Sequence, residues 1–189
     1  MTLKSEHSQS LPKGFRGSGV SAGLKSSGAK DLALIVNDGP DNFASAVFTT
    51  NQVVAAPVIW SRQVLKDNQV SAVLLNSGGA NAATGADGFA DTHKSAEEVA
   101  SLLSISSSDV AICSTGLIGV RLDMEKLIAG VKSAYSSLST NSTEDLARAI
   151  MTTDSKPKIA TYESSGVSFT GIAWWQVMAQ ASRPPWLSR

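Results

Sequence analysis

The sequence predicts a mixed α/β fold, because one arrangement of secondary structure occurs twice in it. A short apolar run of strand type ends in a glycine-bearing loop and is followed by an amphipathic helix, first over residues 71–103 and again over residues 109–135. The chain has 189 residues, of which 42% are hydrophobic and 17% are charged. This composition argues against disorder and indicates one main domain with a sizeable core.

The first half of the chain is predicted to consist mainly of strands and turns. Residues 1–11 are polar and serine-rich and predict a mobile arm. The glycines between residues 14 and 28 favour turns and short strands over helix. Runs of apolar, aromatic or β-branched residues predict strands or extended segments at 31–36, 44–50, 57–61 and 71–75.

Helices dominate the second half. Apolar residues at helical spacing predict a helix over residues 88–103, with His93 on its apolar face. A strand is expected to follow at residues 109–113. Asp123 is expected to cap the next helix, and Ser142 is expected to begin a third helix through a capping box.

Composition excludes several classes of protein. Sixteen basic residues balance sixteen acidic ones, so the chain lacks the positive charge of a nucleic-acid binder. Cys113 is the single cysteine and, with only His7 and His93, it forms no zinc-ligand set. No stretch has the apolar length of a signal peptide or a membrane span. We therefore expect no metal, no cofactor, no nucleic-acid or membrane partner, and a cytoplasmic location.

Two glycine loops, residues 77–79 and 115–116, are candidates for an anion site. In each, a predicted strand leads into residues whose backbone N–H groups can converge on an oxyanion or a carboxylate. Neither loop matches a nucleotide-binding pattern, and simple turns are the alternative interpretation. Cys113 with His93 could form a reactive thiolate, although a lone cysteine in an apolar strand is usually a core residue. On composition alone, residues 151–154 form a polar loop.

Several short motifs carry a family resemblance. The two most specific are Asn76-Ser-Gly-Gly-Ala-Asn81 and Cys113-Ser-Thr-Gly-Leu-Ile-Gly119. The other segments that carry it are 12–16, 19–25, 32–40, 55–58 and 149–154. Taken in order, these motifs resemble the ornithine acetyltransferase family, also called the bifunctional glutamate N-acetyltransferases of arginine biosynthesis. The resemblance covers residues 12–170.

The resemblance implies a layered sandwich of sheets and helices that is incomplete at the C-terminus. It also implies an acyltransferase that moves an acetyl group to glutamate from N-acetylornithine, and in bifunctional members from acetyl-CoA. Family members form an acyl-enzyme on a threonine, in a ping-pong mechanism. Their precursor cuts itself just before that threonine, and the N-terminal part assembles with a C-terminal (β) fragment as a heterotetramer.

Site residues also follow from the resemblance. Thr115 and Gly116 match the family's oxyanion hole, in which a hydroxyl and a backbone N–H meet the charge of the tetrahedral intermediate. Thr152 and Thr153 match a substrate-binding threonine of the family, and the choice between the two hydroxyls stays open.

The chain departs from the family pattern after the strand expected at residues 167–170. The family continues with Val-Gly-Gly-Met-Ala-Lys-Gly and then the nucleophile, whereas residues 171–189 are rich in tryptophan and proline and contain no assignable nucleophile. We therefore expect a main domain over residues 12–170, a divergent tail produced by a reading-frame slip near Gly171, and no catalysis by this chain alone. The alternatives are a non-catalytic binding or assembly module that pairs with a second chain, and an amidohydrolase of related fold.

Overall fold

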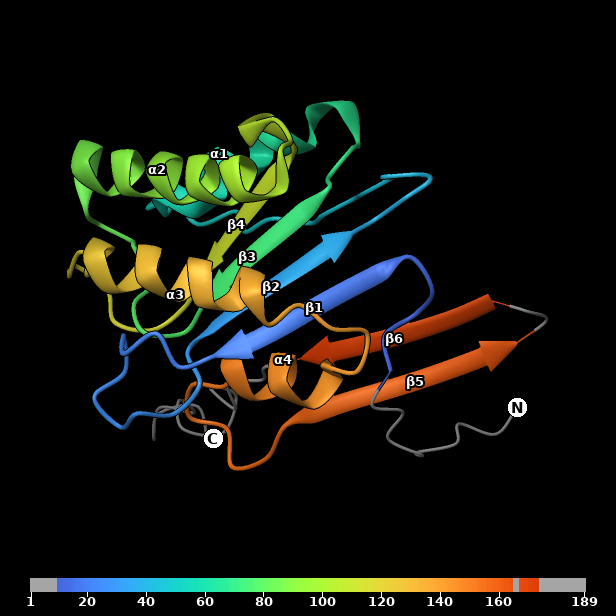
Figure 1. Cartoon of the computed structure of the whole chain (residues 1–189). Coiled ribbons are helices and arrows are strands. Elements are labelled where there is room, and N and C mark those ends of the chain that lie inside the picture. The colour runs from blue at the N-terminus through green and yellow to red at the C-terminus, as the bar shows by residue number, and fades with distance from the viewer. Residues whose placement is uncertain (1–9, 165–166, 174–189) are drawn as a thin grey trace, which may run out of the picture.

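A four-stranded mixed sheet lies at the centre of the molecule (Figure 1). The computed structural model describes residues 10–164 and 167–173. The strand order follows the chain through β1 (Phe15–Val20), β2 (Leu32–Asn37), β3 (Ala72–Asn76) and β4 (Val110–Ser114). β1 pairs antiparallel with β2 and β2 antiparallel with β3, whereas β3 pairs parallel with β4.

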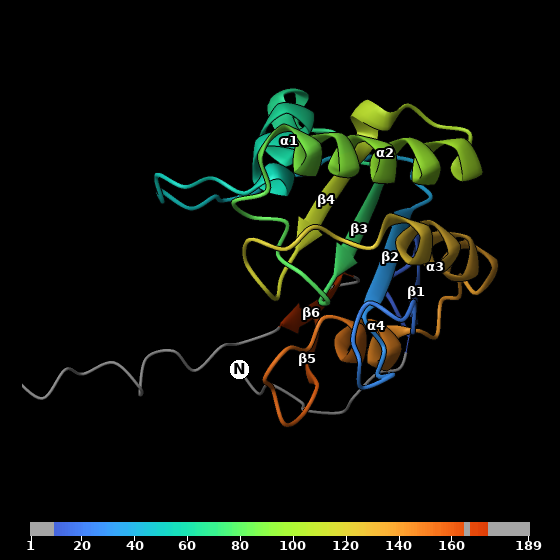
Figure 2. The same cartoon turned by 90° about the vertical axis from the view of Figure 1, so that its left-hand side faces the viewer.

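Helices and a hairpin cover the two faces of this sheet (Figure 1 and Figure 2). One face is covered by α2 (Gly85–Leu103) and α3 (Met124–Ser136), with α1 (Ala56–Val64) packed beside α2 at the β4 edge. The opposite face carries α4 (Thr143–Ala149) and the hairpin of β5 (Lys158–Ser164) and β6 (Val167–Ala173). Two single-turn 3₁₀ helices, η1 (Leu65–Asp67) and η2 (Ser107–Asp109), complete the described chain. This layered α/β arrangement confirms the predicted fold class.

Strand β2 shows how sequence alternation sets the layers. Leu32 and Leu34 are buried in the main core with residues of α2 and α3. Ala33 and Ile35 point to the other face and belong to a smaller cluster around α4. Both faces of the strand are therefore apolar, which explains why the sequence shows a continuous hydrophobic run here.

Two glycines in β1 allow α4 to lie directly on the sheet. A Cβ on Gly17 would sit 2.7 Å from a side-chain carbon of Leu146, and a Cβ on Gly19 would sit 2.1 Å from the carbonyl oxygen of Asp145. Any larger residue at these positions would push the helix away. The glycines of β1 thus serve the close packing of α4 on the strand, and the segment is a regular strand although its composition favours turns.

Two predicted extended segments adopt other conformations. The strand predicted at residues 44–50 is wrong, because these residues pair with no described strand and Val47 is 99% exposed. Strand propensity depends on pairing and burial, and the segment has neither. The extended segment predicted at residues 57–61 is also wrong, because it lies within α1. Pro57 occupies the first turn of that helix, where a fixed φ and a missing N–H are tolerated.

The predicted helix starts at Asp123 and Ser142 are confirmed, but the capping box predicted at Ser142 is wrong. The Asp123 carboxylate caps α3 by accepting a hydrogen bond from the Lys126 N–H at 3.2 Å. Ser142 precedes α4, but its hydroxyl donates to the Ser139 carbonyl at 3.0 Å and does not cap the helix. The helix predicted from residue 88 begins earlier, at Gly85.

The hairpin extends past the predicted end of the main domain. β6 continues to Ala173, and Ile172 packs against the cluster around α4. The predicted arm, apart from its last residues, and the rest of the predicted tail lie outside the described residues. No helix within the described ranges has the length and apolar character needed to cross a bilayer.

The carboxylate of Asp31 organises the loop between β1 and β2. Its side chain is 0% exposed. It accepts three backbone hydrogen bonds, from the N–H groups of Ala22 at 2.6 Å, Leu24 at 2.7 Å and Lys25 at 2.9 Å. Because unpaired buried donors are costly, these three bonds fix the conformation of the loop.

Replacing Asp31 with Asn should lower the free energy of unfolding by about 2–4 kcal/mol, because an amide has one acceptor oxygen where the carboxylate has two. Urea denaturation measures the change. The exposed Asp41 provides the control, and Asp41→Asn should change stability by less than about 0.5 kcal/mol. Equal unfolding midpoints for the two variants would contradict the role given to Asp31.

Candidate functional site

The parallel pairing of β3 and β4 brings two loops to one edge of the sheet. Asn76 lies opposite Ser114 in the register, so the two strands end together. Because parallel strands point in the same direction, the loops that leave their carboxyl ends start side by side, which is the usual place for a site in such sheets. The two glycine loops, residues 77–79 and 115–116, meet there.

Direct backbone contact locks these loops together. Gly116 has a φ of +130°, and a Cβ on it would lie 2.8 Å from the Gly79 nitrogen and 3.1 Å from the Gly78 carbonyl carbon. The Thr115 N–H donates a hydrogen bond to the Asn76 carbonyl at 2.9 Å. Only glycines allow this approach, so the predicted loops form a single structural unit.

Thr115 and Gly116 present two different hydrogen-bond donors. The Thr115 N–H is bound to Asn76, which leaves its hydroxyl as the available donor. The hydrogen bonds among the described residues do not engage the Gly116 N–H, and Gly116 is exposed. An O–H and an N–H donor on adjacent residues are the groups that a developing oxyanion requires.

The end of α4 lies next to the glycine loops. The Ser77 hydroxyl donates a hydrogen bond to the Ala149 carbonyl in the last turn of α4. A small cavity of about 10 Å³ lies between the helix end and the strand ends. It is lined by Leu75, Asn76, Cys113, Ser114, Thr115 and Ile150. The structure therefore places the start of the 151–154 segment beside the Thr115 loop.

Thr152 and Thr153 have different environments. Thr152 is half-buried, and its hydroxyl oxygen is buried without a hydrogen-bond partner among the described residues. Thr153 is exposed. A buried hydroxyl without a partner is costly in a folded protein. This cost makes Thr152 the stronger candidate of the pair for a ligand contact.

Lys25 is a site-adjacent residue that composition and periodicity do not reveal. Its Nζ donates a hydrogen bond to the Met151 carbonyl at 2.6 Å. Burial lowers the pKa of the Lys25 ammonium, while Asp31 and Asp154 act in the opposite direction. The one sequence signal for it is its place at the end of the 19–25 motif.

Cys113 and His93 have separate environments. His93 is exposed, so its predicted place on the buried face of α2 is wrong; its neighbour Thr92 is buried instead. The His93 ring packs on Trp60 with centroids 4.9 Å apart, and its Nε2 lies 3.5 Å from Glu97. Burial raises the pKa of the Cys113 thiol, which disfavours the reactive thiolate. Among the residues that the structure describes, no three His, Cys, Asp or Glu side chains gather to hold a metal.

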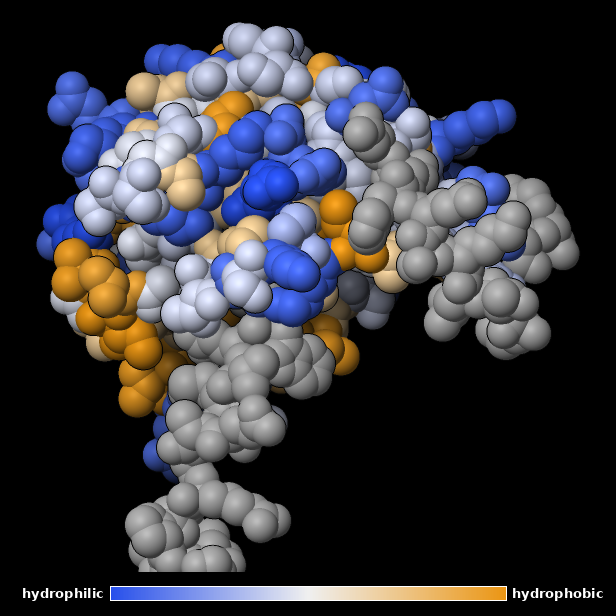
Figure 3. Space-filling view, turned by 90° about the horizontal axis from the view of Figure 1, so that it is seen from below, coloured by the Kyte–Doolittle hydropathy of each residue, from blue (hydrophilic) through white to orange (hydrophobic). Residues whose placement is uncertain are grey.

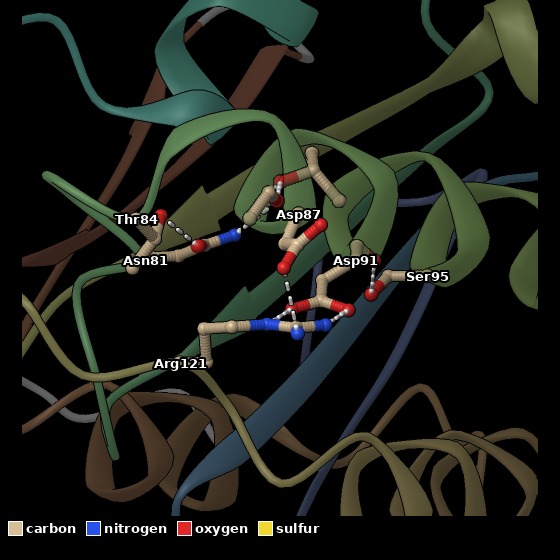
Figure 4. A network of polar contacts seen from close by, with 8 residues as sticks. Asn81, Thr84, Asp87, Asp91, Ser95 and Arg121 are labelled. Carbon is tan, nitrogen blue, oxygen red and sulfur yellow. Dashed lines mark hydrogen bonds and ion pairs between the residues drawn. The ribbon is translucent and has the colours of Figure 1, made fainter.

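A polar network joins the segments that follow the two glycine loops to α2 (Figure 4). Arg121, in the segment after the second glycine loop, binds both carboxylate oxygens of Asp91 at 2.8 and 2.9 Å and one oxygen of Asp87 at 3.2 Å. The amide of Asn81, after the first glycine loop, donates to the Gly88 carbonyl at 2.8 Å. The α2 helix thus supports the site without supplying a donor to it.

Solved structures share this fold and this arrangement of layers. The structure of ornithine acetyltransferase complexed with ornithine from Mycobacterium tuberculosis matches with a TM-score of 0.87 and 49% identity, over 91% of this chain and 94% of that chain. The structure of ArgJ from Bacillus halodurans matches with a TM-score of 0.78 and 31% identity, over 88% of each chain. The fold is therefore of the ornithine acetyltransferase type.

Sequence comparisons identify the family. A model of the ArgJ family matches residues 16–181. The arginine biosynthesis bifunctional protein ArgJ of Streptomyces coelicolor is 53% identical over 161 residues, which are 85% of this chain and 42% of the relative. That of Mycobacterium tuberculosis is 52% identical over 170 residues, covering 86% of this chain and 42% of the relative. The chain belongs to the ArgJ family, and it spans less than half the length of these curated relatives.

Replacing Gly116 with Ala should lower the free energy of unfolding by about 2–4 kcal/mol, because the new Cβ combines backbone strain with a clash against Gly79. Gly119 is a matched control, since it has a φ of +81° and a Cβ on it would meet no other part of the chain within 4 Å. Gly119→Ala should therefore cost only the strain, about 1 kcal/mol. Urea denaturation of both variants measures the difference, and equal losses would show that the loops are not in contact.

Proposed function

We propose that this chain supplies the oxyanion part of an acetyl-transfer site used in arginine biosynthesis. The reaction moves the acetyl group of N-acetylornithine, and in a bifunctional enzyme also that of acetyl-CoA, to glutamate. The observation that carries the proposal is the locked pair of glycine loops, which holds the Thr115 hydroxyl and the Gly116 N–H on adjacent residues. The names of the curated relatives, which place them in arginine biosynthesis, support it.

The proposed chemistry is acyl transfer through a covalent intermediate. A threonine hydroxyl of a partner fragment attacks the acetyl carbonyl carbon, and negative charge develops on the carbonyl oxygen. Thr115 and Gly116 donate hydrogen bonds to that oxygen, and one such donor contributes about 3–4 kcal/mol in comparable enzymes. The C–N bond then breaks, the departing nitrogen takes up the proton that the threonine hydroxyl lost, and ornithine is released. The glutamate amine next attacks the acyl ester and its C–O bond breaks, which forms N-acetylglutamate and returns the proton to the threonine oxygen.

Thr152 and Thr153 are the proposed substrate contacts. The buried, unpartnered hydroxyl of Thr152 favours it over the exposed Thr153. That the Mycobacterium tuberculosis ornithine acetyltransferase was solved with ornithine supports an ornithine-type substrate. The proposed enzyme needs no cofactor or metal and works in the cytoplasm.

A second chain is proposed to provide the nucleophile. This chain covers 94% of the matched chain in the Mycobacterium tuberculosis structure but only 42% of the curated relative from the same organism. Such a difference is expected when an enzyme consists of two fragments, of which this chain corresponds to the first. We propose a C-terminal (β) fragment as the partner, in a heterotetramer.

The tail carries a separate proposal. Residues 171–189 contain neither the motif Val-Gly-Gly-Met-Ala-Lys-Gly nor a recognisable nucleophile, and a reading-frame slip near Gly171 would produce such a tail. Sequencing the gene around that codon tests this idea, because a slip leaves the family motif encoded in another frame. A gene without the motif in any frame would exclude a slip.

The chain alone should show no acetyl transfer between N-acetylornithine and glutamate, because it has no assignable nucleophile. Adding the separately produced C-terminal part of the Streptomyces coelicolor relative should restore turnover. In the restored complex, Thr115→Ala should lower kcat about 100- to 1,000-fold. Thr140→Ala, at an exposed threonine, is the control and should leave kcat unchanged. Turnover by the chain alone, or equal rates for the two variants, would contradict the proposal.

An assembly module is the second candidate function, and exposed apolar side chains favour it. Figure 3 shows hydrophobic side chains at the surface of the described chain. The exposed hydrophobic side chains of the described residues include Leu117 and Ile118, 68% and 71% exposed, in the loop after Gly116, and Phe169, 60% exposed, on β6. Large exposed apolar areas commonly mark interfaces. A stable complex with the C-terminal part that shows no turnover would favour this second function.

A further inference from the structure

We propose that Lys25 is a positioning residue that holds the substrate-binding turn of residues 151–154 in place beside the oxyanion loops. The proposal rests on the proposed acetyl-transfer function and adds a residue to it. Lys25 does not touch the reacting atoms. It acts through the backbone that carries Thr152 and Thr153.

Lys25 connects two segments that are far apart in the sequence. Its Nζ donates to the Met151 carbonyl at 2.6 Å and to the Lys30 carbonyl at 3.1 Å. Its own backbone N–H donates to the buried Asp31 carboxylate at 2.9 Å. The side chain therefore projects from a fixed point on the β1–β2 loop and ends on the first residue of the turn.

The neighbouring residue makes the matching contact to the oxyanion loops. A Cβ on Gly78 would lie 2.3 Å from the Leu24 Cβ and 3.0 Å from the Leu24 carbonyl carbon. Leu24 thus packs directly against the first glycine loop, and that loop is locked to Gly116. Two consecutive residues, both held by Asp31, contact the two parts of the candidate site and fix the spacing between them.

The turn itself depends on this outside support. Among the described residues, the Thr152 N–H makes a single hydrogen bond, a long one of 3.3 Å to the Asp154 carboxylate. Met151 follows the carbonyl end of α4, where a lysine side chain is a favourable hydrogen-bond donor. The titratable groups that face Lys25 are Asp31 and Asp154, and its described acceptors are backbone carbonyls. These contacts assign the side chain to the turn rather than to an ion pair.

The test uses the whole chain and three variants. Lys25→Met removes the donor, Lys25→Arg retains one, and Lys30→Met is the control, because the Lys30 side chain binds the Gly19 carbonyl and Asp145 and makes no described contact with the turn. We expect Lys25→Met to speed amide hydrogen exchange at Thr152 about tenfold or more, with the unfolding midpoint close to that of Lys30→Met. Lys25→Arg should restore slow exchange.

Binding of N-acetylornithine, measured by ligand-observed NMR, separates positioning from stability. Lys25→Met should weaken binding about tenfold while Lys30→Met leaves it unchanged. Unchanged exchange at Thr152 in Lys25→Met, or equal effects of Lys25→Met and Lys30→Met, would overturn the proposal. If the unmodified chain does not bind N-acetylornithine, the substrate assignment fails, and the exchange data still decide the role of Lys25.

A measurement on the unmodified chain covers the case in which Lys25→Met does not fold. The hydrogen bond from the Lys25 Nζ to the Met151 carbonyl oxygen should transmit a scalar coupling between the Nζ and the carbonyl carbon, which NMR can detect. Its presence supports the contact that carries the proposal. Rapid exchange of the Lys25 side-chain protons with water, with no coupling, would overturn it.

Discussion

The parallel pairing of β3 with β4 is the constraint on which the candidate site depends. An antiparallel neighbour would send its following loop to the opposite edge of the sheet. The pair is parallel, and Asn76 at the end of β3 lies opposite Ser114 at the end of β4. The two glycine loops therefore leave the sheet at the same edge. Their glycines then allow direct contact, since a Cβ on Gly116 would meet the Gly79 backbone and force the loops apart. The position of the donors is thus a consequence of strand direction.

A second layer of the fold completes the site from the opposite face of the sheet. The glycines of β1 let α4 lie close to the strands, and the Ser77 hydroxyl binds the last turn of that helix. The chain leaving α4 therefore begins its turn at the strand ends, where Thr152 is located. The buried Asp31 carboxylate supports the same region by fixing the loop that carries Leu24 and Lys25. Four segments that are distant in the sequence therefore meet here: the two glycine loops, residues 24–25 and residues 151–154. The packing of α4 on β1, the Ser77 hydrogen bond and the buried Asp31 carboxylate hold them in place.

Local patterns predicted the elements whose conformation is decided locally. Apolar periodicity placed β2, β3, β4 and α3, and the residue type at position 123 identified a cap, because each depends on residues close in sequence. Residues 44–50 failed because a strand needs a partner, and residues 57–61 failed because proline suits the first turn of a helix as well as an extended segment. The family resemblance suggested Thr115 and Gly116. Their contact with Gly79 depends on strand register, which no local pattern encodes, and Lys25 depends on a turn that lies more than a hundred residues away in the sequence.

Under the proposed function, the oxyanion donors and the nucleophile lie on separate chains, and this separation has a physical consequence. Donors aimed at an oxyanion stabilise charge that develops only when a nucleophile attacks, so without the nucleophile they cannot carry out the transfer. The contacts that place them are nevertheless complete within this chain, since Asp31, Leu24, Gly79 and Gly116 all belong to it. Under the proposed function, the partner chain would meet donors that are already in position. Preorganised donors need no reorganisation at the moment of reaction, so the part of catalysis that depends on rigidity would be encoded in this fragment, and the covalent step in its partner.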